Sequence, residues 1–245
     1  MPCSFFKRVA TAAAAILCLA SAPAFAAGGG GAVERAEIAK GLKVTAVFGV
    51  LETYYPKTFE AAIDAVQQGV ASGKSMRDIQ AQIRTSYADL VKAQLPKAEG
   101  SYVLETLRIT RRQAEAMAAA PPDCMAVLGF GPFRAMAQSV VPPELTKAEL
   151  DWAANMLRQT ATRPVARTVK PPSEETIRLL AFTAYDGVSS DAARQRLQKL
   201  GGAFKGVTDP DDQKAICEFS IQMFAAIEAL PTDQAVDTFL GFSAQ

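Results

Sequence analysis

The feature that most constrains the fold is a helical spacing of apolar residues, which returns in segment after segment from residue 32 to the C-terminus. In residues 59–72 the apolar positions follow at steps of four, three and four: Phe59, Ile63, Val66 and Val70. Such steps place side chains on one face of an α-helix, which has 3.6 residues per turn. We find no segment with the alternating pattern of a half-buried strand. The sequence therefore predicts an all-α fold, an irregular bundle of about eight helices.

Start and stop signals divide the chain into helices. The first is expected over residues 32–55, ended by Pro56, because proline disfavours a helical residue before it. After Pro142-Pro143, Thr146 and Glu149 form a predicted capping box, with Leu145 and Leu150 as a hydrophobic staple. The fold of residues 124–145 stays open, although a short helix with glycine interruptions is expected from Cys124 to Val141. The remaining helices are expected at residues 59–72, 76–95, 101–119, 146–162, 174–186, 191–200, 210–230 and 232–239.

The stretch Gly69-Val-Ala-Ser-Gly-Lys-Ser75 resembles a phosphate-binding loop but fails by one residue. Only three residues separate Gly69 from Gly73, whereas the loop needs four, and no strand precedes it. Gly73 stands just past one expected helix, and Ser75 with Asp78 has the spacing of a helix start. We interpret the stretch as a helix corner, where Ser72 and Lys74 are too exposed for Ser-Lys catalysis.

Residues 1–26 have the form of a secretory signal peptide. Lys7-Arg8 precedes an apolar run that is too short to span a bilayer, and Ala24-Phe25-Ala26 is a small-x-small cleavage site. A transmembrane helix is the competing interpretation, but Pro23 and the glycines of residues 28–31 interrupt it. A lipid anchor at Cys18 is disfavoured because Leu17 occupies a position that needs a small residue. We expect cleavage near Ala26/Ala27, a Gly-rich flexible lead over residues 27–31, and a periplasmic or secreted bacterial protein without a stable membrane span.

The charge of the mature chain excludes one class of partner. Removal of Lys7 and Arg8 leaves 24 basic and 25 acidic residues, a net charge of −1. Such a balance gives no long-range field for nucleic acid, so we expect no nucleic-acid partner.

Two cysteines remain in the mature chain, Cys124 and Cys217. In an oxidising compartment an even pair is most simply a disulfide, so we predict a Cys124–Cys217 bridge. Buried free thiols are the alternative, and a redox pair is disfavoured because the chain has no Cys-x-x-Cys motif. The bridge would tie the chain before residues 163–172 to the last long helix. That favours a single domain over residues 32–245, with a possible sub-boundary at the proline-flanked residues 163–172.

The chain contains no histidine. Every Ser-His-Asp or Cys-His mechanism and the ordinary catalytic zinc sites are therefore excluded. Two cysteines cannot hold an all-thiolate zinc or iron–sulfur site within one chain, and no oxygen-ligand pattern indicates a metal. We expect no metal and no cofactor.

Any catalysis would then rest on carboxylates. Glu52 borders the apolar face of the first expected helix, beside Tyr54 and Tyr55. A half-buried glutamate among aromatic rings can act as a general acid, which makes Glu52 the one weak catalytic candidate. The competing interpretation is that its carboxylate lies in water.

Residues 158–170 form the only locally basic stretch, with no acid between Asp151 and Glu174. A partner contact or a solvated connection would both explain it. Because recognisable catalytic groups are missing, we favour an exported, non-enzymatic protein that binds an unknown protein, envelope component or small ligand in a groove between helices. A glycan-cleaving, carboxylate-dependent envelope enzyme and a purely structural or stress-protective envelope protein are the alternatives.

Overall fold

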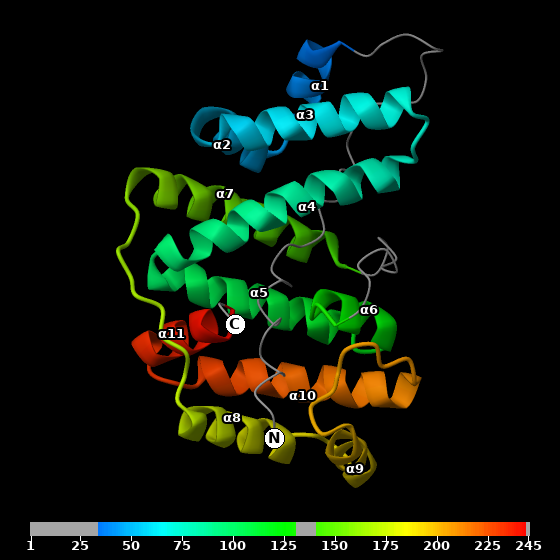
Figure 1. Cartoon of the computed structure of the whole chain (residues 1–245), viewed down its shortest axis with the longest axis vertical. Helices are drawn as coiled ribbons and strands as arrows, with labels where there is room; N and C mark the ends of the chain where they lie inside the picture. The colour runs from blue at the N-terminus through cyan, green and yellow to red at the C-terminus, as the bar shows by residue number, and fades with distance from the viewer. Residues whose placement is uncertain (1–33, 131–140, 244–245) are drawn as a thin grey trace.

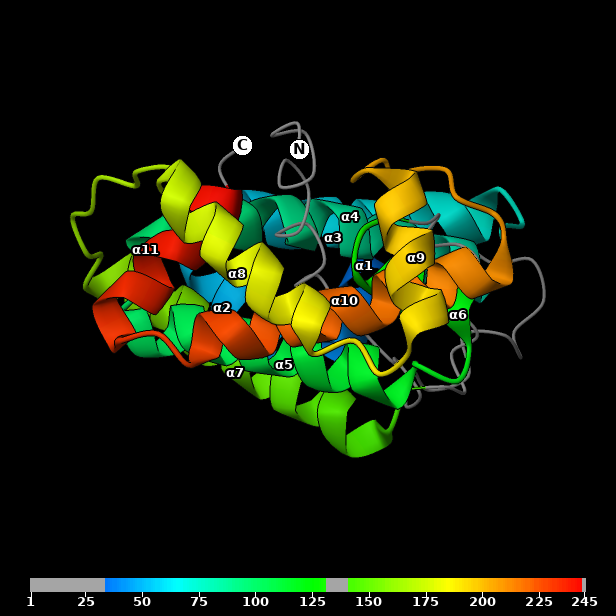
Figure 2. The same cartoon turned by 90° about the horizontal axis from the view of Figure 1, so that it is seen from below.

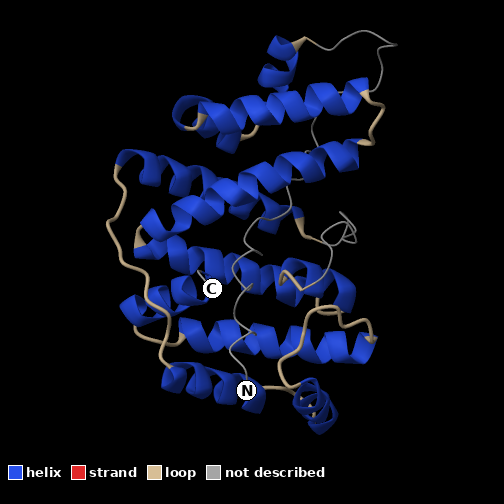
Figure 3. Cartoon of the chain, in the orientation of Figure 1, coloured by secondary structure: helices blue, strands red, loops and turns tan. Residues whose placement is uncertain are grey.

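The computed structural model describes residues 34–130 and 141–243, and these residues form helices joined by turns and loops, without a strand. The all-α prediction is confirmed (Figure 3). The first half of the described chain contains α1 (Arg35–Leu42), α2 (Ala46–Tyr54), α3 (Pro56–Ala71), α4 (Met76–Gln94), the 3-10 turn η2 (Leu95–Lys97), α5 (Gly100–Ala116) and α6 (Pro121–Val127). The second half contains α7 (Pro143–Thr162), α8 (Glu174–Asp186), α9 (Asp191–Leu200), α10 (Pro210–Glu228) and α11 (Thr232–Ser243).

Most helices lie across the long axis of the molecule and follow one another along it (Figure 1). From one end, α1 packs on α3, α2 packs on α3 and α7, and α4 contacts both α3 and α7. Helix α5 lies between α7 and α10, and α8 and α9 pack on α10 at the other end. One continuous set of buried apolar residues runs through these contacts, from Ile38 of α1 to Phe242 of α11. The helix bundle is therefore an elongated stack, with α8 and α9 forming one end of it (Figure 2).

The prediction of a single helix over residues 32–55 is wrong, because the helix ends at Leu42 and a second one begins at Ala46. Thr45 has an extended backbone, with φ −98° and ψ 124°, and α2 starts immediately after it. The break lets Leu42 and Val47 both lie in the core, 4% and 0% exposed. These residues are five apart, a step that an unbroken helix would place on different faces. The next helix begins at Pro56, in the first-turn position that proline tolerates, and not at Phe59.

The capping box predicted at Thr146 and Glu149 is also wrong. Helix α7 begins at Pro143, with Pro142 as the preceding residue, so Thr146 and Glu149 lie inside the helix. Both side chains are buried, 4% and 3% exposed. The staple expected from Leu145 and Leu150 fails for the same reason, since both residues belong to the helix body.

The Gly69–Ser75 stretch is a helix corner, as predicted. Gly69 lies inside α3, Gly73 has a left-handed backbone with φ 64°, and the Ser75 hydroxyl accepts a hydrogen bond from the amide of Asp78 at 3.2 Å. A Cβ on Gly69 would lie 2.3 Å from Cγ1 of Ile79 on α4. Glycine is therefore needed there for the close approach of two helices and not for phosphate binding.

Several expectations concern residues outside the described chain. The predicted signal peptide over residues 1–26, with Cys18, and the Gly-rich lead over residues 27–31 belong to this group. So do residues 131–140 of the undetermined segment 124–145, whereas the end of α6, a turn at Gly129 with φ 76°, and the start of α7 are described. Among the described helices, none has both the length and the apolar character that a bilayer crossing requires.

Candidate functional site

Glu52, the one catalytic candidate from the sequence, lies on the surface of α2. Its side chain is 45% exposed and its Oε1 accepts a hydrogen bond from Nζ of Lys43 at 2.9 Å. Tyr54 beside it is also exposed. The carboxylate is therefore solvated and ion-paired, and the half-buried aromatic setting that would suit a general acid is not what this helix provides.

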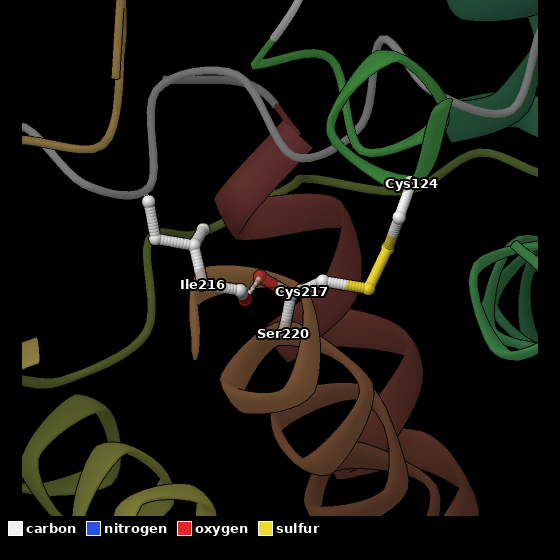
Figure 4. Close-up of a disulfide and its surroundings, with 4 residues drawn as sticks. All are labelled: Cys124, Ile216, Cys217 and Ser220. Atoms are coloured by element: carbon white, nitrogen blue, oxygen red, sulfur yellow. Dashed lines mark hydrogen bonds between the residues drawn. A yellow bond between two sulfur atoms is a disulfide. The ribbon is translucent and has the colours of Figure 1, made fainter. Parts of the chain in front are cut away.

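Cys124 of α6 and Cys217 of α10 form the predicted disulfide (Figure 4). Their Cα atoms lie 6.0 Å apart, and their sequence separation is 93. Both residues are almost fully buried, 0% and 1% exposed. The adjacent turn of α10 is regular, with the Ser220 hydroxyl donating to the carbonyl of Ile216 at 2.8 Å. Burial in a regular helix suits a structural link and not an accessible redox pair.

A polar cluster lies buried between α4, α5 and α7. The amide of Gln113 on α5 donates from Nε2 to Oε2 of Glu149 on α7 at 2.7 Å. Tyr87 of α4 and Thr146 of α7 are buried too, and their hydroxyls have no hydrogen-bond partner in the part of the chain that the structure describes. Burial raises the pKa of Tyr87 well above its usual value, and the Glu149 charge raises it further. Gln113 and Glu149 therefore link α5 to α7 through a polar contact in the core, and Tyr87 of α4 lies close enough for the Glu149 charge to act on it.

Helix α5 carries charged side chains that pair along the helix and with its neighbour α10. Arg108 pairs with Glu105, and Arg111 pairs with Glu115, all on α5. Both arginines also reach Glu228 of α10, from Nε of Arg108 at 2.9 Å and from Nη1 of Arg111 at 3.1 Å. The Glu228 hydrogen bond is the main cause of a raised pKa at Arg108. The two arginines therefore link α5 to α10 through ion pairs with Glu228 and do not form an open anion site.

The basic residues 163–170 lie on the loop that joins α7 to α8. Its backbone is attached to the body of the molecule, since the amide of Val165 donates to the carbonyl of Lys97 at 2.8 Å. Arg167 donates from Nη1 to the carbonyl of Ala98 at 3.2 Å, and Nη2 of Arg163 lies 3.9 Å from Oε1 of Glu99. Arg163 and Arg167 therefore contact the body of the molecule and help to hold the loop in place. These contacts explain the two cations without a partner protein.

Three aspartates lie at the start of α10: Asp209, Asp211 and Asp212. Asp209 caps the helix by accepting from the amides of Asp211 and Asp212, both at 3.0 Å. Arg196 of α9 pairs with all three carboxylates, at 2.8 to 3.1 Å. Within the described residues, no group of three or more metal-ligating acidic or thiol side chains occurs.

The outer face of α8 exposes two large apolar side chains. Leu179 is 60% exposed and Phe182 is 69% exposed, whereas Leu180 and Ala184 on the opposite face are buried against α10. Helix α8 lies at the end of the stack, so no further helix of the described chain covers this face (Figure 2). Among the residues that the structure describes, Val44 at the α1–α2 break is a third large apolar side chain with most of its surface exposed, 68%. End helices of stacked folds normally have polar outer faces, so the exposed Leu179 and Phe182 form the candidate binding surface.

Neither the burial of Glu149 nor the exposed apolar face of α8 is predicted from the sequence. Glu149 precedes Ala153 and Leu157 by four and eight residues, so its helical position is on the apolar face. That spacing indicates that the Glu149 side chain is buried.

In α8, apolar residues occur on more than one face of the helix. Their spacing therefore does not indicate which face packs on the rest of the bundle.

Comparison of the chain with protein-family models, curated proteins and solved structures finds no match.

Proposed function

We propose that the chain is an exported, non-enzymatic protein that binds a partner protein through the outer face of α8. The observation that carries this proposal is the exposure of Leu179 and Phe182, 60% and 69%, on a helix that closes one end of the stack. Burial of an exposed leucine and phenylalanine in an interface contributes strongly to affinity, because each removes a large apolar surface from water. The proposed docking surface is this face, instead of the interhelical groove expected from the sequence.

The compartment belongs to the same proposal. Residues 1–26 have the pattern of a secretory signal peptide, and the Cys124–Cys217 disulfide is of the kind that persists in an oxidising environment. Together they support a periplasmic or secreted bacterial protein. A partner would then be another exported protein or the periplasmic part of an envelope protein.

A glycan-cleaving enzyme is the less favoured alternative. It would depend on Glu52, which is exposed and paired with Lys43. A purely structural or stress-protective role would leave Leu179 and Phe182 exposed without a use. Neither alternative accounts for the apolar end of the stack as directly as a binding role does.

The proposal can be tested by cross-linking at α8. A photo-reactive residue at Thr183, which is exposed beside Phe182, would label neighbours in the periplasm, and each labelled protein would be purified. Its Kd would then be measured with the native chain, with a Leu179→Ser/Phe182→Ser variant and with Val44→Ser. Val44 is a matched control because it is 68% exposed.

We expect the α8 double variant to keep its melting temperature and to weaken binding at least tenfold, or about 1.4 kcal/mol. Val44→Ser should bind like the native chain. An unchanged Kd of the α8 variant for every labelled protein would overturn the proposal. So would turnover of a glycan or ester that Glu52→Gln abolishes.

A further inference from the structure

We infer that the partner of α8 presents a basic amphipathic helix, with apolar residues at its centre and a cation near each end. This inference rests on the proposed docking role of α8. It follows from a stripe of four exposed residues at steps of four, three and four along the outer face: Glu175, Leu179, Phe182 and Asp186. The stripe is apolar in the middle and acidic at both ends.

The dimensions of the stripe define its complement. Asp186 follows Glu175 by eleven positions in the sequence, which corresponds to roughly 16 Å along an α-helix. A second helix with the same 4-3-4 spacing would place two apolar side chains against Leu179 and Phe182. Lysine or arginine at its two end positions would then lie opposite the two carboxylates.

The charges of α8 favour a cationic partner. Its exposed ionic residues are three acids and one base: Glu174, Glu175, Asp186 and Arg178. Neither Glu175 nor Asp186 forms an ion pair within the described chain. Arg194 of α9 is the nearby cation on which Asp186 acts, and Arg194 itself is hydrogen-bonded to Asp191.

The position of Asp186 strengthens this argument. It lies in the last turn of α8, where the negative end of the helix dipole disfavours an acid. Glu175, in the first turn, is explained by the dipole alone. The helix dipole therefore disfavours a carboxylate at Asp186, and a partner cation would offset that contribution.

The same stripe argues against two other occupants. A second copy docked through a twofold axis would place Glu175 against Asp186 in an antiparallel pairing, and against its own counterpart in a parallel one. Both arrangements bring like charges together across the apolar pair. A membrane surface of anionic lipid would likewise be repelled by the two carboxylates that flank Leu179 and Phe182.

Two synthetic helical peptides provide the test. Both carry leucines that match Leu179 and Phe182; one has lysine at each end position, and the other has glutamate there. Kd would be measured by fluorescence anisotropy with the oxidised mature chain and with three variants: Glu175→Gln/Asp186→Asn, Glu175→Lys/Asp186→Lys and Leu179→Ser/Phe182→Ser. Glu34→Gln/Glu37→Gln, which removes two exposed acids at the α1 end of the stack, would control for general changes in surface charge.

We expect the lysine peptide to bind the native chain at least tenfold more tightly than the glutamate peptide, at about 0.05 M salt. Neutralising the two acids should remove this difference, and the double lysine variant should reverse it. Salt of about 0.5 M should narrow it, because exposed charges are screened.

The failures of the two proposals are distinguishable. One result would be that both peptides bind the native chain with equal Kd, with only the Leu179→Ser/Phe182→Ser variant failing to bind them. In that case α8 would remain the docking face, and the inference of a basic partner would be wrong. Equal binding to that variant and to the native chain would overturn the docking face itself. Self-association in sedimentation, or binding to phosphatidylglycerol vesicles, that the serine variant abolished would keep α8 as a docking face but overturn the basic helical partner.

Discussion

The amide of Gln113 and the carboxylate of Glu149 form a 2.7 Å hydrogen bond between α5 and α7, although their residues are only 1% and 3% exposed. A buried carboxylate is costly to remove from water, and its hydrogen bonds in the folded state offset that cost. The pair is thus a specific link between two helices at the centre of the stack.

Glu149→Ala should lower the free energy of unfolding by about 2–4 kcal/mol, because it leaves the buried amide of Gln113 without this acceptor and opens a cavity. Glu149→Gln, which keeps an acceptor, should cost less. Urea unfolding of the three proteins checks the order. An Ala variant as stable as the native chain would contradict the role of this hydrogen bond.

Tyr87 makes a prediction about alkaline pH. Its pKa is raised by burial and by Glu149, so above pH about 10 the unfolded chain loses a proton that the folded chain retains. Stability should therefore fall as the pH rises past that value, by up to about 1.4 kcal/mol per pH unit from this group. Tyr87→Phe should reduce the fall measured by urea unfolding between pH 8 and pH 11, whereas Tyr54→Phe, at an exposed tyrosine, should not. Equal pH dependence of Tyr87→Phe and the native chain would contradict the prediction.

The helices could be predicted because their spacing and terminal residues act locally. Ser75 caps the helix expected of it, and Ser173 and Asp209 cap the helices expected from residues 174 and 210, each accepting a hydrogen bond from a backbone amide in the first turn. Where two local signals competed, the sequence was ambiguous. Pro143 and Thr146 both indicate a helix start, and the core decided between them by burying Thr146 and Glu149.

The candidate site depended on tertiary contacts that no local pattern contains. Leu179 and Leu180 are neighbours of the same type, yet one is 60% exposed and the other 3%. Successive residues of a helix point to different faces, and Leu180 is on the face that packs on α10. The basic loop shows the same limit, because the carbonyl that holds Arg167 belongs to Ala98, far away in sequence.

Glu52→Gln should leave the protein almost unchanged. The side chain is 45% exposed and its pairing with Lys43 is a surface ion pair, so the expected loss of stability is below about 1 kcal/mol. Thermal unfolding would measure this loss, and a screen with glycan and ester substrates would measure turnover. Activity that disappears in Glu52→Gln but survives in Glu60→Gln, another exposed glutamate, would contradict the non-enzymatic proposal.

Reduction of the Cys124–Cys217 disulfide should destabilise the chain by about 4–5 kcal/mol, because the link closes a long loop with a sequence separation of 93. Cys124→Ala/Cys217→Ala should behave like the reduced protein. Urea unfolding with and without a reductant gives the difference, and mass measurement after alkylation shows whether both thiols were protected beforehand. Alkylation of unreduced, natively folded protein would contradict the bridge.

Gly241→Ala tests how firmly the loop between α7 and α8 is held against α11. A Cβ on Gly241 would lie 2.5 Å from the carbonyl oxygen of Lys170 and 2.7 Å from Cδ of Pro172. The first contact is with backbone, so the loop must move, and we expect a loss of about 1–3 kcal/mol. Faster hydrogen exchange at the amide of Val165 would show that the displacement spreads along the loop to its hydrogen bond with Lys97.

Gly49→Ala is the matched control for this substitution. Gly49 lies inside α2 and has nothing within 4 Å of the added Cβ, so alanine should stabilise that helix by up to about 1 kcal/mol. The two changes add the same atom, and only the surrounding space differs. If Gly241→Ala matched Gly49→Ala in urea unfolding and in Val165 exchange, the loop would be free to yield. Helix α8 and its exposed apolar face would then be less rigidly held than the packing at Gly241 implies.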